Sequence, residues 1–143
     1  MIMWKEYFEN KRKQNDCNEG LSQDELSAFQ KRANAQLGFF LPFHYAEILK
    51  HVNGYRNKKK ILYAADVIVV PNKNKKNVPE YISKNFFKII NNPEDKYLYI
   101  GETPNSYFVF DYINNRYLEI SSQTHAIIKK FVNFDTLMKE IIF

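Results

Sequence analysis

The sequence contains little cysteine and glycine and no long apolar run, and each of these absences excludes a class of function. Cys17 is the only cysteine among 143 residues, so no internal disulfide can form, and we expect a reducing, cytoplasmic environment. The four glycines are not clustered, which excludes a glycine-rich phosphate loop and a Gly-x-Ser-x-Gly nucleophile elbow. No apolar run approaches the ~20 residues that span a bilayer, and the N-terminus lacks the apolar stretch of a secretory signal peptide. These absences predict a protein that is neither secreted nor bound to a membrane.

The chain does contain enough apolar and aromatic material for one packed domain. Hydrophobic residues make up 45% of the sequence and aromatic residues 16%. A chain of this length can bury a core without metals or disulfides. No internal repeat divides the sequence, so we expect residues 1–143 to form a single domain.

The apolar spacing predicts helices interspersed with short strands. Expected helices cover residues 3–13, the segment that follows the Ser22-x-x-Glu25 capping box and ends at Gly38, and residues 42–52. Two more are expected, one after Pro79 and a final one from Phe134. The apolar positions of the helix after Pro79 are Ile82, Phe86, Ile89 and Ile90. Expected strands cover 61–64, 67–70, 97–102, 106–112 and 116–121. The Lys/Asn-rich residues 71–78 are expected to form a mobile loop with nothing to bury. The pattern predicts an α+β fold, with an antiparallel sheet of four to six strands and helices packed on one face.

The segment from Leu41 to Gly54 is the most informative part of the chain. Pro42 suits the first turn of a helix, where its missing N–H costs nothing. Asn53 and Gly54 tolerate the left-handed bend that ends many helices. The apolar residues that recur at helical spacing, and should form one buried stripe, are Leu41, Tyr45, Ile48, Leu49 and Val52.

A Leu-Pro-x-x-Tyr opening closed by Asn-Gly resembles the central helix of the SUKH superfamily, which includes the yeast Smi–Knr cell-wall assembly regulators and many bacterial immunity proteins. A strand ending at Gly101, a strand ending at Asp111 and the return strand 116–120 are similar to the family's core. The ending, 131–138, is similar to its closing segment. The nearest sub-pattern is a bacterial YrhA-like branch, in which Asn-Gly is followed by a short strand and an acidic residue, as in 61–66. The residues that carry the fold signature are Leu41, Pro42, Tyr45, Leu49, Asn53, Gly54, Gly101 and Asp111.

The resemblance, which covers roughly residues 22–143 with a divergent middle, implies a binding module and not an enzyme. Bacterial members look like immunity proteins that neutralise toxins, many of which are nucleases. A protein that blocks a basic nuclease cleft is usually acidic, whereas this chain carries a net charge of +5. Its partner is therefore either not a conventional nuclease or bound by a local acidic patch. A regulatory scaffold, like the yeast proteins, is a third alternative. No cofactor is expected, and the expected state is a monomer or weak dimer.

Three side chains at i, i+3 and i+7 share one face of the central helix: His44, Glu47 and His51. They could in principle ligate a metal, but that face lies away from the buried stripe, and His125 is the only other imidazole. Asp111, at a strand end beside an Asn-Asn turn, is expected to be a turn residue and not a general acid. We therefore expect no metal site and no catalytic group.

The basic charge supports an alternative function in nucleic-acid binding. Lysines are concentrated between Arg56 and Lys88, where few acidic residues oppose them. Arginine, the better reader of phosphates and bases, occurs only at positions 12, 32, 56 and 116. Lysine and asparagine also have A/T-rich codons, so genome composition is sufficient to explain the enrichment. Solvated loops are the favoured interpretation of this region, over nucleic-acid binding.

The expected hairpin separates phenylalanines from tyrosines. Strand alternation places Phe108, Phe110, Leu118 and Ile120 on one face with Leu98 and Ile100, and Tyr97, Tyr99, Tyr107, Val109 and Tyr117 on the other. Tyrosine suits protein-binding surfaces, although these rings would also serve to cover the sheet or pack beneath a helix. The loops after Gly54 and Gly101 should flank one end of the sheet. The candidate partner-binding residues, expected to line one shallow concavity, are Tyr55, Arg56, Glu102 and Tyr107.

Overall fold

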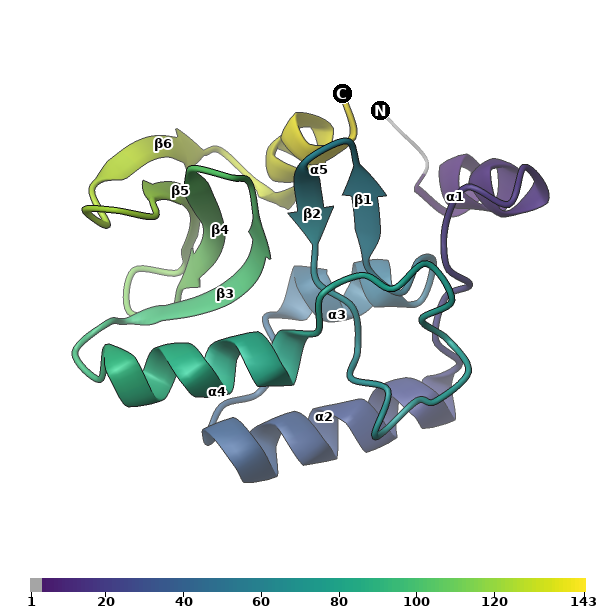
Figure 1. Cartoon of the computed structure of the whole chain (residues 1–143), viewed down its shortest axis with the longest axis horizontal. Helices are drawn as coiled ribbons and strands as arrows, with labels where there is room; N and C mark the ends of the chain where they lie inside the picture. Colours follow the sequence, from purple (N-terminus) through teal and green to yellow (C-terminus); the bar gives the residue numbers. More distant parts are fainter. Residues whose placement is uncertain (1–3) are drawn as a thin grey trace.

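Six antiparallel strands form one sheet in sequence order, β1 to β6, in the computed structural model, which describes residues 4–143 (Figure 1). The strands are β1 (Tyr55–Asn57), β2 (Lys60–Leu62), β3 (Tyr97–Glu102), β4 (Ser106–Asp111), β5 (Arg116–Ser121) and β6 (Ile127–Phe131). The helices are α1 (Trp4–Lys13), α2 (Gln23–Leu37), α3 (Phe43–Leu49), α4 (Tyr81–Asn91) and α5 (Phe134–Ile142). The predicted α+β class and antiparallel sheet are confirmed. No helix within the described residues is long and apolar enough to cross a membrane.

The sheet is strongly curved at its β3–β6 end, and α4 runs along this part with α2 on its outer side (Figure 1). Aromatic rings join these helices to α3 in the core. Tyr81 of α4 lies 5.9 Å from Phe29 of α2 and 5.1 Å from Tyr45 of α3, measured between ring centroids. The Tyr45 hydroxyl also donates to the Tyr63 carbonyl at 2.6 Å, which satisfies a polar atom in this buried position.

The predicted capping box starts α2. The Ser22 hydroxyl accepts a hydrogen bond from the Glu25 backbone N–H at 3.2 Å, and the Glu25 carboxylate accepts from the Ser22 N–H at 2.8 Å. The second bond, together with Lys73 nearby, holds the pKa of Glu25 below its usual value. Gly38 ends the helix with a φ of 81°. The helix predicted at residues 3–13 corresponds to α1, but its expected first residue lies outside the described part of the chain.

The central helix α3 is shorter than the predicted 42–52. The N–H groups of Lys50 and His51 donate to carbonyls three residues earlier, so the last turn tightens and the regular helix stops at Leu49. The burial prediction is confirmed, because Leu41 is only 6% exposed and the other three residues, Tyr45, Leu49 and Val52, are completely buried. Gly54 has the predicted positive φ, 74°. A Cβ there would lie 2.8 Å from that of Ala64, so the chain needs glycine for close packing as well.

The strand predicted at 67–70 is wrong. These residues form a turn in which the N–H groups of Val69 and Val70 donate to the Asp66 carbonyl, at 2.9 and 3.1 Å. Short runs of β-branched residues also occur in turns, and periodicity cannot separate the two cases over so few positions. The neighbouring prediction, at 61–64, corresponds to β2.

Two edge strands, β1 and β6, were not predicted. The first has only three residues. The second has no buried face before its last residue, so its sequence lacks the apolar–polar alternation that marks a half-buried strand. Ile127 and Ile128 are 42% and 56% exposed, and Lys129 and Lys130 follow them. Lysines on an exposed edge hinder pairing with another chain.

The side chains of β5 face the opposite way from the prediction. The hairpin pairs Asp111 with Arg116, leaving a four-residue loop, whereas the predicted loop had three residues. A one-residue shift of register exchanges the faces of a strand. Leu118 and Ile120 therefore share a face with Val109 and Tyr107, and Tyr117 packs against Phe110, with ring centroids 5.0 Å apart.

The Lys/Asn-rich residues 71–78 are held more firmly than predicted. Val78 is only 2% exposed, so this segment does bury an apolar side chain. The Asn74 side chain accepts from the Val78 N–H at 2.9 Å and donates to the Val78 carbonyl at 2.8 Å. An asparagine side chain thus closes the loop in the way that a neighbouring strand would.

Replacing Leu49 with alanine should lower the free energy of unfolding by about 2–5 kcal/mol, because the side chain is fully buried and its removal leaves a cavity. Phe43→Ala is the matched control on the same helix. Phe43 is 70% exposed, so its loss should cost no more than about 0.5 kcal/mol. Chemical denaturation of both variants tests this, and equal losses would contradict the assigned orientation of α3.

Asp111 should make the protein sensitive to acid. Burial opposes its charged form, but hydrogen bonds from Asn114 and Arg116 outweigh that effect and hold the pKa below its usual value. A lowered folded-state pKa stabilises the fold at pH values above the unfolded-state pKa, about 4, and the contribution is lost as the pH falls through the folded-state pKa. Asp111→Asn should therefore cost about 1–3 kcal/mol at pH 7, and the difference from the wild type should shrink below pH 4. The exposed Glu94→Gln is the control in denaturation measured across pH; a constant difference would refute the linkage.

Candidate functional site

Helix α4 is docked on β3 by one buried asparagine. Asn85 is completely buried; its amide donates to the Tyr99 carbonyl and its side-chain oxygen accepts from the Tyr99 N–H, both at 2.7 Å. β2 pairs with β3 only opposite Glu102 and Gly101, so the backbone of Tyr99 has no strand partner on that side. The asparagine takes the place of the missing strand, and this fixes the distance between helix and sheet.

The first turn of α4 is fixed by Asp66. Its carboxylate accepts from the backbone N–H groups of Ile82 and Ser83 at 2.7 and 3.1 Å, and from the Ser83 hydroxyl at 2.7 Å. Carboxylates at a helix N-terminus satisfy its free N–H groups and favour its dipole. The acidic residue that the YrhA-like pattern singled out thus caps a helix that begins well beyond it in the sequence.

These two anchors determine which side of α4 faces solvent. Of the four apolar positions expected in this helix, Phe86 and Ile90 are 47% and 62% exposed, and the neighbouring Phe87 is 64% exposed. The buried face carries Asn85 in their place. Hydrophobicity along the sequence does not predict that Asn85 is buried. A polar side chain is expected to face solvent unless it has a buried hydrogen-bond partner, and this partner lies on β3.

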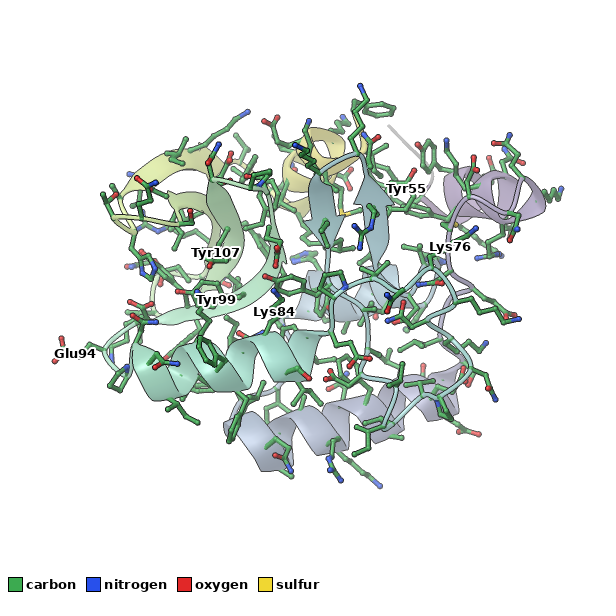
Figure 2. The ribbon with its side chains drawn as sticks, viewed as in Figure 1. Tyr55, Lys76, Lys84, Glu94, Tyr99 and Tyr107 are labelled. Atoms are coloured by element: carbon green, nitrogen blue, oxygen red, sulfur yellow. The ribbon has the colours of Figure 1, made fainter. Side chains whose placement is uncertain are left out.

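A hollow lies between the exposed side of α4 and β4, with a volume of about 480 Å³. We call it the α4–β4 surface, and its lining residues are Pro79, Glu80, Ser83, Lys84, Phe87, Lys88 and Tyr107. Figure 2 shows Tyr99, Tyr107 and Lys84 gathered where α4 passes beside β3 and β4. The hollow combines an exposed phenylalanine and a tyrosine with flanking charges, which is the composition of protein interfaces.

The two lysines of this surface have different partners. The Lys84 ammonium forms an ion pair with the Glu102 carboxylate at 3.0 Å. Lys88 donates to the Tyr107 hydroxyl at 2.7 Å and lies over the same ring, 4.1 Å from its centroid. No carboxylate in residues 4–143 pairs with Lys88. In this part of the chain Lys88 is therefore a cation without an ion pair, next to an aromatic ring, in a hollow that Glu80 also lines.

Three of the four predicted partner-binding residues lie in one row across the sheet. Arg56 is opposite Ile61, Ile61 is opposite Glu102, and Glu102 is opposite Tyr107, so all share one face. Arg56 is exposed, and its guanidinium donates to the Asn77 carbonyl at 3.3 Å. Glu102 and Tyr107 border the α4–β4 surface, whereas Arg56 lies beyond it, at the β1 edge.

Tyr55 does not belong to this row. It is 6% exposed, and its ring lies 5.3 Å from that of Phe8 in α1, in an edge-to-face contact. Neighbouring residues on a strand face opposite sides, so Arg56 can be exposed only if Tyr55 points into the core. Tyr55 therefore does not share a face with the other three predicted residues, although it lines a small cavity with Arg56.

Glu102 also makes more contacts within the protein than a residue at the edge of a binding surface would. It accepts a hydrogen bond from the Tyr63 hydroxyl at 2.7 Å in addition to its ion pair with Lys84. Burial, and secondarily the Glu102 carboxylate, raise the pKa of Tyr63. Replacing Glu102 with lysine would leave a buried hydroxyl without its acceptor and place two ammonium groups together. Glu102 therefore contributes to the stability of the fold as well as to the surface.

The tyrosines of β3 and β4 are largely covered. Tyr99 is 1% exposed, and its hydroxyl donates to Asp95 at 2.7 Å. Its ring packs edge-to-face on Tyr107, with centroids 5.2 Å apart. Burial first, and then Asp95, raise the pKa of Tyr99. Most of the tyrosine-rich face thus serves packing, and Tyr107 is the tyrosine that lines the α4–β4 surface.

His44 of α3 and His51, which follows the end of that helix, line one hollow together with Glu47, as their spacing predicted. His44 is exposed and stacks on Phe134 at 5.9 Å, with Nδ1 3.3 Å from the Tyr117 hydroxyl. His51 is half-buried, and burial together with the nearby Lys5 lowers its pKa. Within residues 4–143, no group of three histidine, cysteine or acidic side chains is placed to hold a metal ion.

No family model matches the chain, and neither the curated proteins nor the solved structures contain a match. Its function is therefore inferred from the geometry and chemistry of its own surfaces.

Proposed function

We propose that this protein is a non-catalytic binding module that neutralises a toxin domain in the manner of bacterial immunity proteins, and that it binds its partner through the α4–β4 surface. The observation that carries this proposal is the exposed ring of Phe87, on a helix anchored at its first turn and in its middle, beside Tyr107 of β4. Large apolar side chains that lie exposed together on a fixed element mark sites of protein association.

The α4–β4 surface is prepared for binding before a partner arrives. Asp66 caps one end of α4 and Asn85 holds its middle, so Phe87 and Lys88 project from a backbone that is already ordered. Lys88 also restrains Tyr107 through its hydrogen bond. Side chains that are ordered in the free protein lose less entropy on association, which favours affinity.

The charges indicate the chemistry of the partner. Lys84 is neutralised within the chain by Glu102, whereas Lys88 keeps an unpaired positive charge beside the aromatic hollow. A matching partner would insert an apolar side chain beside Phe87 and present a carboxylate to Lys88. This chemistry favours a toxin with an acidic contact surface over the basic cleft of a conventional nuclease. It also accommodates the net charge of +5.

The SUKH-like pattern supports the same proposal. The Leu-Pro-x-x-Tyr segment forms a buried helix that leads into a glycine with positive φ, and the three segments ending near Gly101, Asp111 and Ile120 form consecutive antiparallel strands. We propose on this basis that the chain is SUKH-like and acts in the cytoplasm as a monomer or weak dimer. A regulatory scaffold with the same surface is the alternative within this class.

Phe87→Ala should weaken binding to the cognate toxin domain by roughly thirtyfold or more, the effect of losing about 2 kcal/mol at the centre of an interface. Stability should change by no more than about 0.5 kcal/mol, because the side chain is 64% exposed. The measurement is calorimetry, together with survival on co-expression, against the C-terminal domain of a large toxin encoded directly upstream. Phe43→Ala, with 70% exposure on α3, is the matched control and should protect like the wild type.

Full protection by Phe87→Ala and by Tyr107→Phe/Lys88→Ala would place the interface elsewhere. Failure of the wild-type chain to bind or protect would overturn the toxin proposal itself. Tyr107→Phe is preferred to Tyr107→Ala because it keeps the ring that packs on Tyr99.

Salt dependence should separate protein binding from the alternative function in nucleic-acid binding. The observation that favours the alternative is that Arg56, Lys75 and Lys76 are all exposed and line two adjoining cavities near β1, with Lys76 shared by both. Binding that depends on six or more phosphate contacts would weaken about 10³-fold or more between 50 and 200 mM salt. We expect the toxin complex to weaken far less, since its centre is aromatic. Affinity measured at both concentrations tests this, with a random oligonucleotide as comparison.

A further inference from the structure

A second cavity, of about 330 Å³, lies away from the α4–β4 surface, between the end of α1 and residues 72–76. Figure 2 shows Lys76 on this loop, on the other side of β1 from Tyr107. Cys17 and Asn18, from the connector between α1 and α2, form its floor and also line a smaller adjoining cavity that reaches Arg56. Ligand pockets in proteins begin at about 300 Å³, so a small molecule fits this space.

The walls of the cavity carry a clear excess of positive charge. Four basic side chains line it, Arg12, Lys73, Lys75 and Lys76, against one carboxylate, Glu19. Lys73 is compensated, because its ammonium lies 3.4 Å from both Glu19 and Glu25. The other three are not.

Arg12, Lys75 and Lys76 keep their charges available. Arg12 donates to the His51 carbonyl at 2.6 Å, which orients the guanidinium without neutralising it. Within residues 4–143, neither Lys75 nor Lys76 has an ion pair. A guanidinium and two ammonium groups around one hollow form an arrangement that recognises phosphate oxygens.

Asparagine hydrogen bonds hold the lysine-bearing loop in place. Asn18 accepts from the Lys76 N–H at 2.8 Å and donates to the Asn53 carbonyl and to the Asn74 side chain, both at 2.9 Å. Asn53, completely buried, donates to the Lys73 carbonyl at 2.9 Å. The loop therefore has a defined backbone although it has no regular secondary structure, and its cations emerge from fixed points around the cavity.

We propose that this cavity binds a small phosphate-bearing molecule, with the phosphate held by Arg12, Lys75 and Lys76. The adjoining cavity, which shares Cys17, Asn18 and Lys76, would take the rest of the ligand and place a second anionic group near Arg56. Asp16 also lines this cavity, and its single charge is opposed by Arg56 and Lys76. A small ligand fits better than a nucleic-acid strand. The site is a compact, partly open hollow with three available cations, whereas polymer binding commonly engages six to ten phosphates along an extended track.

The test is calorimetric titration of the full chain with pyrophosphate, and separately with inorganic phosphate, at low salt. We expect saturable 1:1 binding, with pyrophosphate the tighter ligand because it can also reach the adjoining cavity. The double variant Lys75→Ala/Lys76→Ala should bind at least about tenfold more weakly, since it loses two charged donors. Lys59→Ala/Lys130→Ala removes the same net charge from exposed positions outside the cavity and should bind like the wild type.

Equal weakening in both double variants, or the absence of saturable binding by the wild type, would overturn the proposal. A 20-nucleotide strand that binds far more tightly than pyrophosphate, with loss in both variants, would overturn it in favour of a nucleic-acid track. Phe87→Ala should leave pyrophosphate binding unchanged. The outcome is therefore independent of whether the α4–β4 surface binds a toxin.

Discussion

Strands of unequal length are the constraint on which this fold depends. β2 ends opposite Gly101, so β3 extends past it with backbone groups that have no strand partner on that side, and a buried peptide group without a partner is costly. Asn85 satisfies the N–H and carbonyl of Tyr99 together, and in doing so docks α4 on the sheet. The exposed position of Phe87 follows directly, because a helix anchored through one side must present the other to solvent.

The same physical solution recurs where the chain leaves the central helix. Asn53 accepts from the Ala65 N–H at 2.7 Å and donates to the Lys73 carbonyl, and Asn18 continues this network to Lys76. Side-chain amides can act as donor and acceptor at once, so they join irregular segments that cannot form a ladder. Both proposed binding regions therefore lie next to buried asparagines, and in both the functional side chains project from a fixed backbone.

Much of the fold could be predicted from sequence, but less of the candidate site. The capping box at Ser22, the buried stripe through Leu49 and the bend at Gly54 depend on contacts near in sequence, and all were predicted correctly. Tyr107 was predicted for the surface and lies there, but Tyr55 is buried, because the face of a three-residue strand cannot be read without its partners. The faces of β5 were assigned wrongly, since one residue of loop length reverses them.

The sequence by itself determined the α+β class, the ends of α2, the burial of the central helix and the order of the three longest strands. Periodicity, caps and turn residues carry that information because they act over a few residues. The tertiary structure alone decided that Asn85 is buried while Phe87 is exposed, that Asp66 caps a distant helix, and that Arg12 meets Lys76 across a cavity. Each of these depends on a backbone group or charge that the fold brings close from elsewhere in the chain. Local hydrophobicity does not predict such a partner.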